Sequence, residues 1–164
     1  NYGSVCRPGE YGACKKVDNF WSCASDACYP CPPGTYSKAS AGAISECLAC
    51  QTGRASNMSA TKSCSVCYKG RYATTAGEND GYGVYSGATI CLACPAGKKM
   101  SQNSSYLCKD CPAGKSSKEE SKECSDCEAG EYTNSLIGAT GCKDCASPSS
   151  SRAGETNCSI CVEE

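Results

Sequence analysis

Eight Cys-x-x-Cys pairs constrain this chain more than any other feature of its sequence. Successive pairs are 16 to 19 residues apart, apart from one interval of 27 residues. Self-similarity at a fixed period is typical of a repeat array. The pairs are Cys28/Cys31, Cys47/Cys50, Cys64/Cys67, Cys91/Cys94, Cys108/Cys111, Cys124/Cys127, Cys142/Cys145 and Cys158/Cys161.

Composition makes the sulfur atoms responsible for stability. The 164 residues include 19 Cys, but Leu, Ile, Val and Phe together number only 14. So little apolar surface does not offset the conformational entropy that folding removes. We therefore expect no large hydrophobic core, and we expect cross-links to replace one.

A glycine turn follows almost every pair. Gly lies three residues after the second Cys at Gly34, Gly53, Gly70, Gly97, Gly114 and Gly130, whereas the last repeat has Pro148 there. Glycine suits a tight turn because it adopts positive φ without steric cost. Gly-Ala-Thr occurs in two of the following loops, at 87–89 and 138–140.

These features predict a small, disulfide-rich fold: an elongated tandem array of short β-hairpin and loop repeats with little or no helix. Residues 1–30 form a distinct N-terminal cysteine-rich head, and residues 31–161 form seven repeats. We number the repeats 1 to 7, beginning at Cys31, Cys50, Cys67, Cys94, Cys111, Cys127 and Cys145.

Three chemistries compete for the sulfur atoms. Two pairs about 15 residues apart match the spacing of a zinc ribbon. Zinc would use the pairs two by two, however, whereas the repeats resemble one another singly. A redox role requires a βαβ context and a thiol of lowered pKa at a helix N-terminus. Disulfides account for the pattern best.

The simplest pairing joins the second Cys of one pair to the first Cys of the next. Each bond closes a loop of about 13 to 24 residues and stabilises the fold by roughly 3 kcal/mol in the chain-entropy model. The predicted bonds are Cys31–Cys47, Cys50–Cys64, Cys67–Cys91, Cys94–Cys108, Cys111–Cys124, Cys127–Cys142 and Cys145–Cys158.

Five cysteines fall outside this series. In the head we expect Cys6–Cys23 and Cys14–Cys28, while the two other pairings remain open. Cys161 is left unpaired in this chain, so its partner belongs to a later repeat or to another molecule.

Two segments resemble a known module. CPPGTYSKASAGAISECLAC at 31–50 and CEAGEYTNSLIGATGCKDC at 127–145 are similar to the ephrin-receptor-like cysteine-rich repeat and to the first loop of tumour-necrosis-factor-receptor cysteine-rich modules. The resemblance covers about residues 28–161. It implies extracellular, disulfide-bonded, elongated arrays of the tandem type found in receptor ectodomains and in algal and protist surface proteins. The second, interlocked disulfide pair of the tumour-necrosis-factor-receptor module is absent from these repeats.

The sequence predicts no enzyme, no cofactor and no metal site. His is absent, which removes Ser-His and Cys-His nucleophiles. The acidic cluster Glu119, Glu120 and Glu123 is interpreted as solvated charge. Glu78, Asn79 and Asp80 carry oxygen ligands that suit calcium, but an ordinary flexible loop is the preferred interpretation.

Aromatic side chains supply the candidate contacts. Phe20 and Trp21, the only Phe and Trp of the chain, predict either a small local core or a partner contact. Tyr82 and Tyr85 lie in the insertion of repeat 3 at 77–87 and are candidates for lateral packing or ligand contact.

Sugar attachment is expected on the surface. Asn57, Asn103 and Asn157 begin N-glycosylation sequons, which fit a secreted protein. The segment SPSSSRAG at 147–154 suits O-linked sugar as well as it suits a solvated Ser-rich loop.

The combined features predict a secreted or cell-surface structural glycoprotein: a disulfide-linked rod that serves as surface coat, stalk or filament subunit. The alternative is the ligand-binding ectodomain of a receptor. Net charge is −1 and no apolar run is long enough to span a bilayer, so we expect neither nucleic-acid binding nor a membrane span in this segment. Expected partners are further copies, head to tail or side by side, or other extracellular proteins. Because the chain begins with Asn1, we expect a processed or partial chain.

Overall fold

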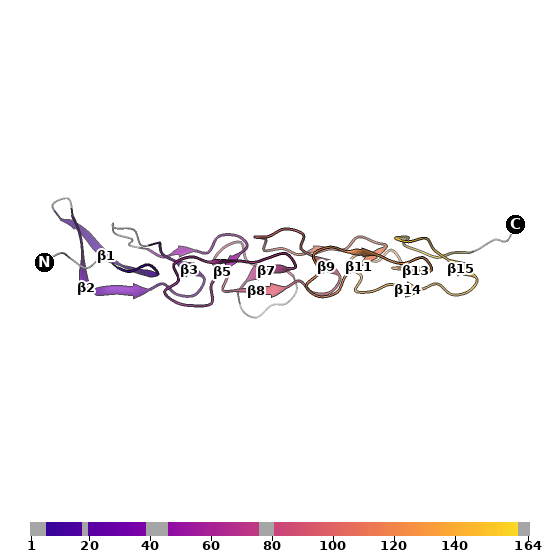
Figure 1. The fold of residues 1–164 in the computed structure, drawn as a ribbon, viewed down its shortest axis with the longest axis horizontal. Helices are drawn as coiled ribbons and strands as arrows, with labels where there is room; N and C mark the ends of the chain where they lie inside the picture. The colour runs from indigo at the N-terminus through magenta and orange to yellow at the C-terminus, as the bar shows by residue number, and fades with distance from the viewer. Residues whose placement is uncertain (1–5, 18–19, 39–45, 76–80, 161–164) are drawn as a thin grey trace. The chain divides into compact units, whose positions relative to one another are not determined.

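Short β-hairpins make up the described structure. The computed structural model describes residues 6–17, 20–38, 46–75 and 81–160, with residues 13–17, 20–27 and 160 described only in their backbone. Within these ranges there is no helix, and sixteen strands form eight two-stranded sheets (Figure 1). The predicted hairpin-repeat fold without helix is confirmed.

Each repeat carries one hairpin, and the cysteine spacing explains its position. The first strand follows the turn after the second Cys of a pair. The second strand contains the two residues between the cysteines of the next pair. The paired strands are β3 (Thr35–Tyr36) with β4 (Leu48–Ala49), β5 (Arg54–Ala55) with β6 (Ser65–Val66), β7 (Arg71–Thr74) with β8 (Ile90–Ala93), β9 (Lys98–Lys99) with β10 (Lys109–Asp110), β11 (Lys115–Ser116) with β12 (Ser125–Asp126), β13 (Glu131–Tyr132) with β14 (Lys143–Asp144), and β15 (Ser149–Ser150) with β16 (Ser159–Ile160).

The chain divides into two compact units. The first contains Asn1–Cys67, Ala73–Gly77 and Gly83–Cys91, and the second contains Tyr68–Tyr72, Glu78–Tyr82 and Leu92–Glu164. Each has its own small cluster of buried side chains. Cys67, Ala73 and their neighbours form the cluster of the first unit, and Tyr72, Cys94 and Met100 form that of the second.

Cysteine dominates what is buried. Among the described residues, nine of the fifteen buried apolar side chains are Cys. Isolated two-stranded hairpins are marginal in water, so these sulfur atoms supply packing as well as covalent links. For the described residues, the predicted absence of a large core is confirmed.

One disulfide closes each of the seven repeats, with the pairing that the spacing predicted: Cys31–Cys47, Cys50–Cys64, Cys67–Cys91, Cys94–Cys108, Cys111–Cys124, Cys127–Cys142 and Cys145–Cys158. Their Cα atoms are 5.6, 5.7, 5.5, 5.9, 5.7, 5.7 and 5.8 Å apart, within the usual range for a disulfide. Cys161 lies outside the described residues.

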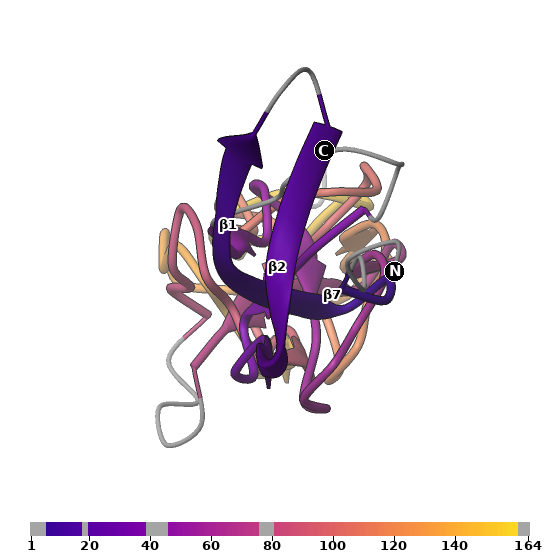
Figure 2. The same ribbon diagram turned by 90° about the vertical axis from the view of Figure 1, so that its left-hand side faces the viewer.

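The disulfide pairing of the head differs from the prediction. Cys6 bonds to Cys28, so the predicted Cys6–Cys23 and Cys14–Cys28 are both wrong. The cause is the long antiparallel hairpin of β1 (Glu10–Val17) and β2 (Phe20–Pro30), seen as a curved ribbon in Figure 2. Its register sets Cys14 opposite Cys23 and brings Cys28 to the base of the hairpin, near Cys6.

The same register places Phe20 opposite Val17 and Trp21 opposite Lys16 in the backbone pairing. The side chains of Phe20 and Trp21 lie outside the described part of the structure. The residues Glu78, Asn79 and Asp80 of the insertion lie outside it altogether. Their predicted roles therefore stay predictions.

Candidate functional site: the junction between repeats

The turn glycines join each repeat to the next through the backbone. In all seven repeats the N–H of the opening Cys donates to the carbonyl of the preceding turn glycine, which for Cys31 is Gly9 of the head, over 2.7 to 3.0 Å. Examples are Cys111 N–H to Gly97 O at 2.9 Å and Cys145 N–H to Gly130 O at 2.7 Å. The turn glycines have φ of 69° to 90°, as predicted, and this conformation aims the carbonyl at the next repeat.

A second set of contacts reaches one repeat further. In repeats 2, 3, 5, 6 and 7, one left-handed residue of the loop bonds to the preceding repeat and is here called the loop residue: Ala60, Gly87, Glu120, Gly138 and Gly154. Its N–H donates to the carbonyl of the Cys that opens the preceding repeat, over 2.8 to 2.9 Å. The carbonyl of the loop residue lies against the turn glycine two repeats earlier, which for Ala60 is Gly9 of the head. The approach is so close that a Cβ on the glycine would overlap with the carbonyl oxygen.

These close approaches follow a fixed offset. Gly97 of repeat 4 meets Gly138 of repeat 6, and Gly114 of repeat 5 meets Gly154 of repeat 7. Gly97 and Gly114 therefore contact both the next repeat and the next but one. Gly130 of repeat 6 is the exception, because no described atom lies within 4 Å of where its Cβ would be.

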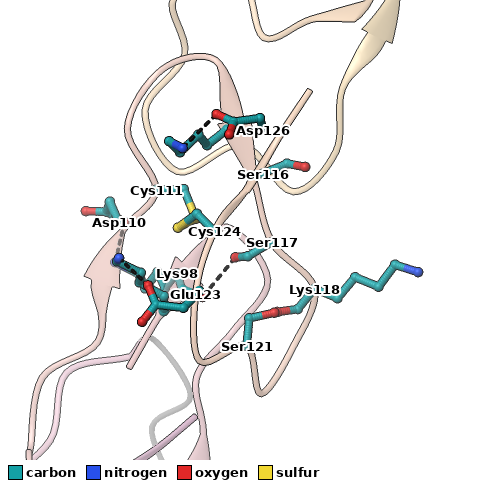
Figure 3. Close-up of a disulfide and its surroundings, with 12 residues drawn as sticks. Lys98, Asp110, Cys111, Ser116, Ser117, Lys118, Ser121, Glu123, Cys124 and Asp126 are labelled. Atoms are coloured by element: carbon teal, nitrogen blue, oxygen red, sulfur yellow. Dashed lines mark hydrogen bonds and ion pairs between the residues drawn. A yellow bond between two sulfur atoms is a disulfide. The ribbon is translucent and has the colours of Figure 1, made fainter. Parts of the chain in front are cut away.

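Small hydroxyl side chains complete the junction. The third residue after the turn position is buried in all seven repeats, namely Ser37, Ser56, Ala73, Met100, Ser117, Thr133 and Ser151. Three of the serines donate to a carbonyl of the preceding repeat or head: Ser37 to Glu10 O at 2.7 Å, Ser117 to Lys98 O at 2.8 Å (Figure 3) and Ser151 to Glu131 O at 2.7 Å. A buried hydroxyl needs such a partner. Sequence reasoning missed this role, although the recurrence of Ser and Thr at one position signals it.

Ion pairs lie on the outside of the junction. Lys98 pairs with Asp110 at 2.8 Å and Lys115 with Asp126 at 2.6 Å, each across one hairpin. Lys99 reaches Glu123 of the following repeat at 2.7 Å. Figure 3 shows these pairs around the Cys111–Cys124 disulfide. Exposed pairs of this kind contribute little each.

Arg71 and Glu120 form the one bidentate pair among the described residues, over 2.7 and 3.1 Å. The hydrogen bond from the guanidinium, which stabilises the ionised form, lowers the pKa of the Glu120 carboxyl below its ordinary value. Glu120 and Glu123 of the predicted solvated cluster are thus exposed but paired.

The candidate contact tyrosines are exposed. Tyr82 is 54% exposed, and the ammonium of Lys98 lies 4.7 Å from its ring centroid. Tyr85 is 71% exposed, and its carbonyl accepts a hydrogen bond from the Thr52 hydroxyl at 2.9 Å. The two residues belong to different units, so each is a separate candidate.

The three sequon asparagines are also exposed but differ in their hydrogen bonds. The Oδ1 atom of Asn103 accepts from the backbone N–H of Lys69 at 3.0 Å. The Nδ2 atom of Asn157 donates to the hydroxyls of Ser135 and Thr156, each at 3.3 Å. Glycosylation at these positions remains a prediction.

Comparison with models of known protein families and with curated protein sequences finds no match to this chain. Within the described ranges, no helix has the length and apolar character needed to cross a bilayer.

The close approach at the turn glycines predicts a graded response to alanine. Gly130→Ala meets open space but keeps φ at 88°, a conformation that costs an L-residue about 1–2 kcal/mol. We expect about 5- to 30-fold faster hydrogen exchange at the Cys145 amide, which bonds to Gly130 O. Gly97→Ala adds a clash with the Gly138 carbonyl, so exchange at the Cys111 amide should accelerate more.

Gly141→Ala is the matched control, because Gly141 lies outside the left-handed region and meets nothing within 4 Å. This substitution should leave hydrogen exchange at the Cys111 and Cys145 amides unchanged. Equal effects of Gly97→Ala and Gly130→Ala would contradict the proposed contact between repeats 4 and 6.

The Arg71–Glu120 pair predicts a shift in titration. Arg71→Met removes the guanidinium, so the pKa of Glu120 should rise toward its ordinary value, as followed by carbon NMR of the carboxyl group. Because the folded pKa is depressed, the stability that the pair contributes is present above the unfolded pKa and is lost as pH falls through the folded one. An unchanged Glu120 titration in Arg71→Met would show that the pair does not form in solution.

Proposed function

We propose that this chain is part of an extracellular structural glycoprotein, in which the repeats form a disulfide-stapled rod that serves as surface coat, stalk or filament subunit. The observation that carries the proposal is the junction itself. Each of the seven repeats is closed by its own disulfide and bonded through its backbone to the preceding repeat or, for repeat 1, to the head. Such an array remains folded without a core, and its length follows the number of copies.

The disulfides support an oxidising location. All sixteen cysteines whose side chains are described are in disulfide bonds, and such bonds persist outside the cell but are rare in the cytosol. An extracellular or cell-surface protein with N-linked sugar at Asn57, Asn103 or Asn157 fits this chemistry.

The open position at Gly130 supports association. In five equivalent positions the turn glycine is covered by the carbonyl of a loop residue. A further repeat of the same kind, in this chain or in another copy, would supply that carbonyl and an N–H for the Cys145 carbonyl. Heterologous contacts of this type extend into fibres when they do not close.

A length series tests the rod. Residues 94–126 comprise two whole repeats, 4 and 5. Inserting a second copy directly after residue 126 preserves the disulfide pairing and the contact from each repeat to the next but one. Small-angle X-ray scattering should show a maximum dimension that grows with each duplication while the cross-section stays constant. Growth in all directions, as in a compact domain, would contradict the proposal.

The alternative, a ligand-binding ectodomain, is favoured by the exposure of Tyr85 in the insertion of repeat 3. It predicts saturable binding of the chain to intact cells of its source, lost in Tyr85→Ser but kept in Tyr29→Ser, which changes another exposed tyrosine. Equal binding by both variants would leave the structural proposal as the better one.

A further inference from the structure

A hollow on the second unit lies beside one of the sequons. It has a volume of about 430 Å³ and is lined by Tyr68, Lys69, Arg71, Asn103, Glu120 and Lys122. Its lining thus combines one aromatic ring with five polar or charged side chains. Nothing in the structural role of the junction requires an aromatic ring here.

The amide of Asn103 is held in one orientation. The Lys69 N–H donates to its Oδ1 atom at 3.0 Å, so the oxygen side of the carboxamide faces the backbone of repeat 3. In the described part of the chain, its Nδ2 atom makes no hydrogen bond, whereas Nδ2 of Asn157 makes two. The nitrogen that would carry a sugar is therefore not engaged by a described partner at Asn103, which borders the hollow.

Tyr68 provides an apolar surface in the same hollow as Asn103. It is 68% exposed although it borders the hollow. Tyrosine is enriched at contact surfaces because it combines an apolar ring with a polar hydroxyl. The apolar face of a pyranose ring fits the face of a tyrosine, and its hydroxyl and acetamido groups require polar partners.

The polar partners are present and fixed. Arg71 and Glu120 hold each other through two hydrogen bonds, and Lys122 lies on the same border. Their remaining donors and acceptors are preorganised for sugar hydroxyls, which lowers the entropy cost of a contact.

We infer that Asn103 is an N-glycosylation site whose first sugar packs on the ring of Tyr68, within the hollow bounded by the Arg71–Glu120 pair. The inference rests on the proposed extracellular function. In the attachment step, the Asn103 Nδ2 atom bonds to the anomeric carbon of a lipid-diphosphate-linked oligosaccharide. The bond from that carbon to the diphosphate oxygen breaks, the lipid diphosphate leaves and one amide proton is lost.

The test compares glycoforms of the whole chain, secreted from a eukaryotic host and trimmed to one sugar by an endoglycosidase. The reference is the wild-type chain secreted while oligosaccharide transfer is inhibited, because Ser105→Ala would remove the sequon together with the hydroxyl that hydrogen-bonds to Leu107. We expect the one-sugar form to unfold a few degrees higher than this sugar-free form. Tyr68→Ala should remove that difference, and Tyr68→Phe should retain it because the ring remains.

Tyr85→Ala is the matched control, since Tyr85 is equally exposed but does not border this hollow. It should leave the difference between glycoforms intact. Glycopeptide mapping of protein from the natural source accompanies the series.

The outcomes separate the two proposals. Sugar at Asn103 with a stabilisation that Tyr68→Ala does not change would overturn the inference alone. Sugar at Asn57 but not at Asn103 would also overturn it and would leave the glycoprotein proposal standing. Absence of sugar at all three sequons in protein from the natural source would overturn both.

Discussion

The fold depends on the disulfide that closes each repeat, because Cys makes up most of the buried apolar side chains among the described residues. A loop of about 15 residues gains roughly 3 kcal/mol from such a bond in the chain-entropy model. The bond also fixes the distance between the turn and the second strand of the hairpin. At that distance the N–H of the next Cys meets the carbonyl of the turn glycine, for example Cys111 with Gly97. A hydrogen bond worth about 1 kcal/mol is then made without further ordering of the chain.

Packing between repeats uses the backbone more than the side chains. A carbonyl of one repeat lies on the turn glycine of another two places earlier, and this contact needs only the absence of a Cβ. The residue that supplies the carbonyl varies accordingly, being alanine at Ala60, glutamate at Glu120 and glycine at Gly138. The array therefore tolerates changes of sequence on its surface, where the tyrosines, sequons and ion pairs lie.

The sequence predicted the repeat hairpins and their seven disulfides because both follow from a spacing that is nearly constant. It did not predict Cys6–Cys28, because the register of the head hairpin depends on pairing between residues 10–17 and 20–30 rather than on cysteine spacing. The contact to the next repeat but one was missed for a similar reason. This contact depends on the conformation of the loops. Ala60 and Glu120 adopt the left-handed region there, which sequence reasoning expects only of glycine.

The buried hydroxyls and ion pairs fall between these cases. Ser117 and Ser151 recur at a fixed distance from the turn, and this recurrence is visible in the sequence. Their hydrogen bonds to the preceding repeat become clear only from the arrangement of the hairpins. Asp110 and Asp126 precede the second Cys of their pairs, and only the strand register shows that Lys98 and Lys115 lie opposite them. The turn, the hairpin and the disulfide of a repeat can be predicted from its own sequence, whereas contacts between repeats require the three-dimensional structure.

Amide hydrogen exchange on the oxidised and the reduced chain tests the central claim most directly. If disulfides replace the core, the seven Cys amides that bond to turn glycines should be protected in the oxidised chain. Reduction should then abolish protection throughout the repeats. Protection that survives complete reduction would show that packing alone maintains the fold, and would contradict the account.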